Sequence, residues 1–228
     1  MGLFGNIFKG KNSSSTGVPT NPGPIQTPLN TYKAPENQPP VGILNLKKND
    51  ILNLSKASPN LHKIRVAAGW DVNCSYGSDY DLDLCAFLLD RNGKPVKNTQ
   101  NMVFYGKKNA TGIFLDGDNL TGEGDGDDEN IYVTLNRLHP NVERIVFNVV
   151  IYQAKSRSQY FGKVKNAYVR IVDESNNGRE MCRYSLSDDG GRNTAVVFAE
   201  LYKENGFWNF RAIGEYTNGS IQDLFNNY

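Results

Sequence analysis

Histidine and cysteine are scarce in this chain of 228 residues, which has two histidines and three cysteines. Neither His62 nor His139 lies in a Ser/His/Asp or Cys/His pattern of a nucleophilic enzyme. Cys74, Cys85 and Cys182 form no CxxC pair and have no histidine at the spacing of a zinc site. We therefore expect no enzyme, no catalytic residue and no zinc, and we expect the reduced cysteines of a cytoplasmic protein.

Long apolar runs and nucleotide-binding loops are missing as well. No stretch is long enough to cross a membrane as a helix, and no glycine loop precedes a helix that carries a lysine. No motif that combines basic and aromatic residues indicates nucleic acid, so we predict no nucleic-acid partner.

Apolar side chains near the N-terminus are few but regularly spaced. Residues 1–11 place four of them at helical spacing and end in two lysines. This pattern is typical of a short amphipathic segment that contacts the inner face of a membrane or a partner protein, and a frayed tail is the alternative. Residues 10–41 are rich in Ser, Pro, Asn, Thr and Gly, which predicts a flexible linker. We therefore divide the chain into a tail and linker, residues 1–41, and a folded domain, residues 42–228.

Short runs of β-branched and aromatic residues fill the domain. The runs are GILNL, DILNL, KIRVAAGW, LDLCAFLLD, NMVFYG, NIYVTL, RIVFNVVIY, AYVRIVD, CRYSL, TAVVFAELY and FWNFRAI. Asn-Gly and Gly-Gly pairs that favour tight turns separate several of them. The pattern predicts an all-β fold, a β-sandwich of two mainly antiparallel sheets, with short helical turns at residues 135–138 and in the last ten residues.

Acidic residues are unevenly distributed, although the formal net charge is only +1. Half of them lie in two windows without any lysine or arginine, residues 66–90 and 109–136. Carboxylates held this close repel one another unless water, a basic partner or a cation compensates. The remainder of the chain is net basic, which predicts a polarised surface.

The first window places three carboxylates on one side of a strand. Asp79, Asp81 and Asp83 alternate with a tyrosine and two leucines, and a continuous apolar run follows. We expect the carboxylates at the rim of the sandwich, where the strand begins. The alternative is a solvated polar face that binds no ligand.

The second window is a glycine-rich loop, GDNLTGEGDGDDE, at residues 117–129 between the MVFYG and IYVTL strands. Gly122, Gly124 and Gly126 allow it to fold tightly around a ligand. Carboxylate, amide and carbonyl oxygens in such a loop suit Ca²⁺, which takes six to eight oxygens, better than Mg²⁺. An EF-hand is excluded, because Leu84 stands where that motif needs glycine. The sequence thus predicts a cation site built from two separate loops.

Several motifs together resemble the TerD family of tellurium-resistance proteins from bacterial stress operons. They are GWD (69–71), GSDYDLDLCAFLLDRNGK (77–94), GDNLTGEGDGDDE, RIVFNVVIYQA (144–154), FGKVKNAYVRI (161–171), RYSLSDD (183–189), TAVVFAELY (194–202) and WNFRAIG (208–214). The resemblance implies a two-sheet β-sandwich with two neighbouring calcium ions. It implies the ligands Asp71, Asp79, Asp81, Asp83, Asp118, Asn119, Asp125, Asp127, Asp128 and Glu129, with Glu123 and Asp116 behind them.

We therefore expect a calcium-binding stress-response protein of the tellurium-resistance type that acts through protein partners, among them other proteins of this type. The alternative is a calcium-stapled structural or assembly module without a sensing role, tethered to a membrane or complex by residues 1–11. A metal-dependent enzyme ranks third, because histidine and basic companions are missing from the acidic windows.

Overall fold

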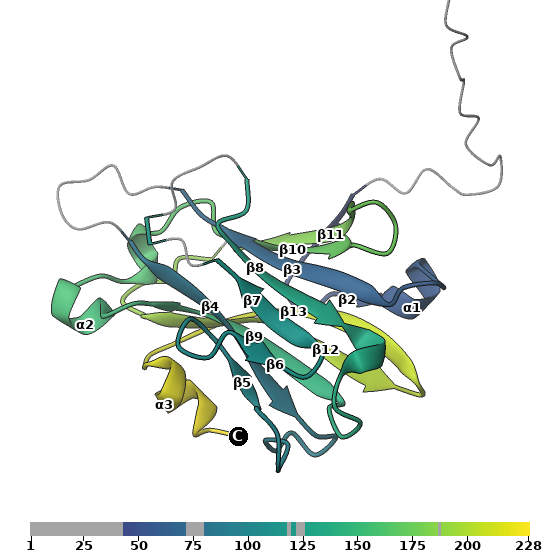
Figure 1. Ribbon diagram of the computed structural model, residues 1–228. Coiled ribbons are helices and arrows are strands. Elements are labelled where there is room, and N and C mark those ends of the chain that lie inside the picture. Colours follow the sequence, from purple (N-terminus) through teal and green to yellow (C-terminus); the bar gives the residue numbers. More distant parts are fainter. Residues whose placement is uncertain (1–42, 72–79, 118–119, 122–125, 187) are drawn as a thin grey trace, which may run out of the picture. The chain divides into compact units, whose positions relative to one another are not determined.

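The architecture is a β-sandwich whose sheets lie face to face (Figure 1). The computed structural model describes residues 43–71, 80–117, 120–121, 126–186 and 188–228. The predicted tail and linker lie outside this set. So do the predicted site residues Asp79, Asp118, Asn119, Glu123 and Asp125.

Seven described strands form the first sheet, in the order β1-β11-β10-β3-β8-β7-β6. They are β1 (Leu44–Leu46), β3 (Lys63–Gly69), β6 (Asn109–Ala110), β7 (Ile113–Asp116), β8 (Glu129–Thr134), β10 (Tyr168–Asp173) and β11 (Arg179–Ser185). Six form the second sheet, in the order β2-β13-β12-β9-β4-β5. They are β2 (Ile51–Asn53), β4 (Leu82–Leu89), β5 (Met102–Val103), β9 (Arg144–Ile151), β12 (Ala195–Glu204) and β13 (Phe207–Thr217). Only β1 and β11 pair in parallel among these strands, so the predicted class of fold is confirmed.

Two of the predicted turns close neighbouring strands. Asn205 and Gly206, with φ of 51° and 82°, join β12 to β13, and Asn177 and Gly178, with φ of 53° and 70°, join β10 to β11. Both pairs have the positive φ values that suit the right-handed twist of a hairpin. The acidic loop, however, follows β7 rather than the MVFYG segment directly. Ile113 and Leu115 are buried and alternate with exposed residues, which makes this short segment a strand of its own.

The described helices are short. They are α1 (Leu54–Ala57), η1 (Leu135–Arg137), α2 (Ala154–Arg157), η2 (Phe161–Lys163) and α3 (Ile221–Phe225). Helical turns at η1 and α3 confirm the two predicted positions. The side chain of Ser220 accepts a hydrogen bond from Asp223 N, and the Asp223 side chain accepts one from Ser220 N, which is a capping box. Within the described ranges, no helix is long and apolar enough to cross a membrane.

Strand β4 is buried on both faces, which explains its continuous apolar run. Leu82 and Leu84 point into the core between the sheets. Cys85 and Phe87 point the opposite way, into a second cluster on the outer face of the six-stranded sheet. Helix α3 covers that second cluster (Figure 1). The start of β4 therefore lies beneath two packed layers, and this position determines the environment of its carboxylates.

Candidate metal centre

The two carboxylates of the first acidic window that the structure describes are buried. Asp81 and Asp83 are 5% and 4% exposed, whereas the sequence indicated a polar rim. The predicted alternation is confirmed here, because Leu82 and Leu84 face the core between the sheets and Asp83 faces the other side. Charged carboxylates this deeply buried need strong compensation from hydrogen bonds or opposite charge.

The carboxylate of Asp127 binds arginines on the outer face of the seven-stranded sheet. Its oxygens lie 2.5 Å from Arg65 Nη1 and 2.7 Å from Arg170 Nη2, and Tyr168 Oη donates a hydrogen bond at 3.0 Å. Burial opposes ionisation of Asp127, but the hydrogen bonds and charge of Arg170 outweigh it, with help from Tyr168 and Arg65. The pKa of Asp127 is therefore lowered, and the carboxylate joins the loop before β8 to β3 and β10.

Asp128 binds the backbone of β3 instead. Its Oδ2 accepts a hydrogen bond from Trp70 N at 2.8 Å, and its own N–H donates to Ala68 O at 2.9 Å. Burial raises the pKa of Asp128, and the negative charges of Asp127 and Asp71 raise it further. Asp71, from the first acidic window, and Asp128, from the second, are therefore electrostatic neighbours.

Glu129 connects the two sheets. It is 1% exposed, and its Oε2 accepts a hydrogen bond from Leu84 N at 2.5 Å. Burial raises the pKa of the Cys85 thiol, and the charges of Asp83 and Glu129 add to this effect. Carboxylates from both acidic windows thus lie close to the same segment of β4.

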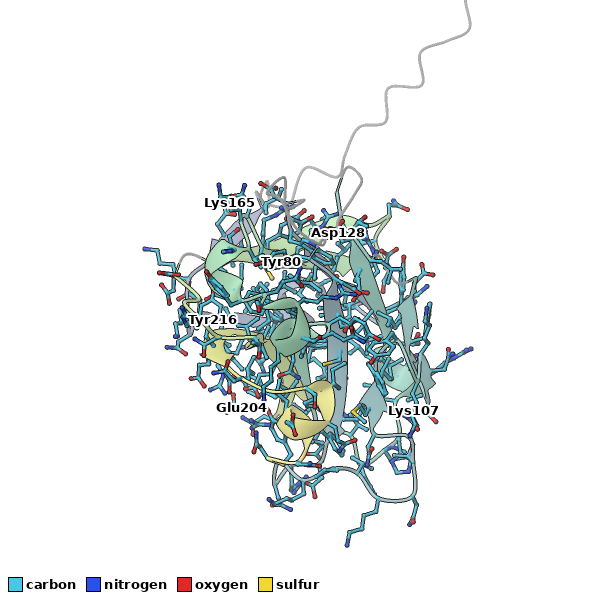
Figure 2. All side chains as sticks on the ribbon, turned by 90° about the vertical axis from the view of Figure 1, so that its left-hand side faces the viewer. Tyr80, Lys107, Asp128, Lys165, Glu204 and Tyr216 are labelled. Carbon is cyan, nitrogen blue, oxygen red and sulfur yellow. The ribbon has the colours of Figure 1, made fainter. Side chains whose placement is uncertain are left out.

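Asp71 is held by the segment that precedes β10. Its Oδ2 accepts a hydrogen bond from Asn166 Nδ2 at 2.5 Å, and its N–H donates to Lys165 O at 3.0 Å. Figure 2 shows Tyr80, Asp128 and Lys165 toward the upper end of the domain, with Glu204 below them. The described members of both windows therefore gather at one end of the sandwich.

The structure brings together part of the predicted ligand set. The six predicted ligands that it describes are Asp71, Asp81, Asp83, Asp127, Asp128 and Glu129. Among described residues alone, no group of three or more His, Cys, Asp or Glu side chains is arranged to hold a metal ion. The other four predicted ligands, Asp79, Asp118, Asn119 and Asp125, lie outside the described ranges.

The sequence did not predict which basic side chains lie beside these acidic residues. Arg65 and Arg170 supply the positive charge beside Asp127, although no base lies within the acidic windows. Each arginine alternates with buried residues along its strand, which marks it as facing outward. Their proximity to Asp127 depends on the register of β3 with β8 and β10.

The two histidines lie in loops and bind backbone groups. His62 Nδ1 lies 3.1 Å from Asn60 O, and His139 Nδ1 accepts a hydrogen bond from Asn141 N at 3.3 Å. Both contacts are between residues two positions apart, as is usual for side chains that support a turn.

Comparison with known proteins identifies similar chains. The family described as TerD domain matches residues 43–228. The chain is 40% identical over 187 residues to "Tellurium resistance protein TerD" of Serratia marcescens, covering 81% of this chain and 96% of that protein. It is 42% identical to "General stress protein 16U" of Bacillus subtilis, with 81% and 96% covered. A crystal structure of a telluride resistance protein homologue from Streptomyces coelicolor has a similar fold, with a TM-score of 0.58, 24% identity, and 73% and 96% of the two chains covered.

Proposed function

This chain belongs to the TerD domain family of tellurium-resistance and stress-response proteins, and we propose that it acts by binding calcium at the end of the sandwich where its acidic windows meet. Calcium organises this end of the domain for protein partners, and the cellular outcome is stress resistance. The proposal assigns no chemical reaction to the site.

The observation that carries the proposal is the convergence of carboxylates from two distant parts of the sequence. Asp83 and Glu129 both lie close enough to Cys85 to influence its thiol, and Asp71 lies close enough to Asp128 to influence its carboxyl. Like charges that are buried together destabilise a fold unless a cation balances them. Ca²⁺ fits the all-oxygen chemistry of these side chains, and its coordination geometry tolerates ligands from separate loops.

The predicted ligands take different parts in this proposal. Asp81, Asp83, Asp128 and Glu129 contribute buried or half-buried carboxylates at the described end of the sandwich. Asp71 and the four predicted ligands outside the described ranges complete the two sites. Asp127 stands beside the ions rather than on them, because Arg65 and Arg170 already bind its oxygens.

Calcium then has a structural effect as well as a regulatory one. An ion held by both acidic windows joins β4 to the loop before β8, so the binding free energy adds to the stability of the fold. Weak binding with a structural change supports sensing, whereas tight and permanent binding supports a staple.

Other proteins of the same type are the proposed partners. Serratia marcescens has relatives called "Tellurium resistance protein TerD", "TerX" and "TerZ", so several members of the family occur in one organism. We also propose that residues 1–11 bring the domain to a partner or to a membrane surface, because they combine apolar spacing with two lysines.

A calorimetric calcium titration of the chelator-treated protein tests the proposal, with thermal unfolding measured alongside. We expect about two ions per chain and a higher melting temperature with calcium. Absence of both binding heat and a thermal shift would contradict the calcium site. Deletion of residues 1–41 should leave calcium binding intact and reduce membrane or partner association; unchanged association would contradict the tether.

A further inference from the structure

A cavity of about 890 Å³ lies at the outer face of the six-stranded sheet, and residues of both α2 and α3 line it. Its size is within the range of pockets that bind small molecules, roughly 300 to 1,000 Å³. Val150, Ile151 and Met102 line it from the sheet, and Ile221 lines it from α3. The cavity is therefore mostly apolar and is framed by the ends of regular elements.

One wall of the cavity is aromatic. The rings of Phe104 and Tyr105 meet edge to face with centroids 5.2 Å apart, and those of Tyr105 and Tyr152 do so at 5.7 Å. All three residues line the cavity, and Tyr105 is 39% exposed. Aromatic rings of this kind attract apolar ligands, and their faces also attract organic cations.

A buried carboxylate lies against the apolar surface. Asp83 lines the cavity and is directly opposite Val150 in the β4–β9 pairing, so their side chains share one face of the sheet. Two further charged residues, Lys155 and Asp223, line the cavity, but both are exposed and have opposite sign. Solvent screens those two charges, whereas the charge of Asp83 acts in a low-dielectric environment.

From this arrangement we propose that the cavity binds a small organic amine with an apolar or aromatic body. The ammonium group lies toward Asp83, and the apolar body lies along the wall formed by Phe104, Tyr105 and Tyr152. A carboxylate accepts several hydrogen bonds, so an ammonium group adds to those that Asp83 already makes. Asp83 is also one of the proposed calcium ligands, but the inference rests on the cavity and does not require calcium.

Three probes of similar size test the charge preference: phenethylamine, 2-phenylethanol and phenylacetate. Each is titrated into the full-length protein by calorimetry without added calcium. We expect one amine per chain, an alcohol that binds about tenfold more weakly, and no detectable binding of the anion. Equal binding of all three probes, or no binding of the amine, would overturn the proposal.

Substitutions of residues that line the cavity test whether the amine binds there. Asp83→Asn should remove the preference for the amine over the alcohol, and Tyr105→Ala should weaken both by about tenfold. Phe207→Ala is the control, because Phe207 is 46% exposed and does not line the cavity. Tyr105 is partly exposed, so Tyr105→Ala remains informative if Asp83→Asn fails to fold. Amine binding unchanged in Tyr105→Ala would place the site elsewhere and overturn the proposal.

The calcium titration separates this inference from the proposed function. Calcium binding without amine binding overturns the cavity assignment alone, and amine binding without calcium binding overturns the calcium site alone. If Asp83 binds calcium, saturating calcium should also weaken the amine by neutralising the carboxylate.

Discussion

The side chain of Glu129 accepts a hydrogen bond from the backbone N–H of Leu84 at 2.5 Å, across the two sheets. Strand β4 pairs with β9 along its whole length, but with β5 only at Ala86 and Phe87. Leu88 N donates to Asn101 O on the β5 side, and even-numbered N–H groups of β4 point that way. Glu129 therefore supplies the acceptor that a neighbouring strand would otherwise provide.

This relationship predicts the effect of changing Glu129. Glu129→Ala leaves the Leu84 N–H buried without its acceptor and should lower the free energy of unfolding by about 3 kcal/mol. Glu129→Gln keeps an oxygen acceptor and should cost about 1 kcal/mol. Urea unfolding in chelator measures both values. Equal losses in the two variants would show that the hydrogen bond to Leu84 contributes little.

Asp127 is predicted to matter for stability rather than for calcium. Asp127→Asn removes the charge between Arg65 and Arg170, whose side chains are 18% and 22% exposed. We expect a loss of about 2 kcal/mol, below the 3–5 kcal/mol of a fully buried pair because solvent reaches both arginines. The calcium stoichiometry should not change.

A surface ion pair serves as the control for Asp127. Arg91 and Glu143 lie 2.9 Å apart, and Arg91 is 74% exposed. Glu143→Gln should leave the unfolding free energy nearly unchanged, because solvent screens this pair. If Asp127→Asn loses one bound calcium ion instead, Asp127 is a ligand and its assignment beside the ions is wrong.

Alanine substitutions at two glycines with similar φ values distinguish the cost of backbone strain from the cost of a steric clash. Gly214 has φ of 67°, and a Cβ atom there would lie 2.0 Å from the hydroxyl of buried Tyr184. Gly178 has φ of 70°, and nothing lies within 4 Å of a Cβ atom. Gly178→Ala should cost about 1 kcal/mol for the left-handed conformation, and Gly214→Ala about 3 kcal/mol because the clash adds to it. Similar losses in urea unfolding would mean that Tyr184 moves aside freely.

Much of the fold could be predicted because most strands have their own apolar pattern, although β6 has none. The run of acidic residues also predicted that water, a basic side chain or a cation must compensate its negative charge. What could not be predicted depends on register and packing. The sequence places Arg65 and Arg170 far from Asp127, and only the pairing of β3 with β8 and β10 brings them together. The burial of Cys85 and Phe87 on the outer face likewise depends on α3, which comes from the end of the chain.

Asp81 offers the sharpest test of the calcium site, because its carboxylate is buried, at 5% exposure, directly before β4. Asp81→Asn keeps the shape of the side chain but removes the charge that binds a cation. We expect calcium affinity to fall by at least about tenfold, and the calcium-dependent rise in melting temperature to shrink with it. Glu204→Gln is the matched control, since Glu204 is exposed and ends β12, whose opposite end, at Ala195, lies beside Val150 and Asp83. Both variants lose one negative charge, so a general charge effect would lower calcium affinity equally in the two. A loss confined to Asp81→Asn would instead place calcium at the start of β4, where the two acidic windows meet.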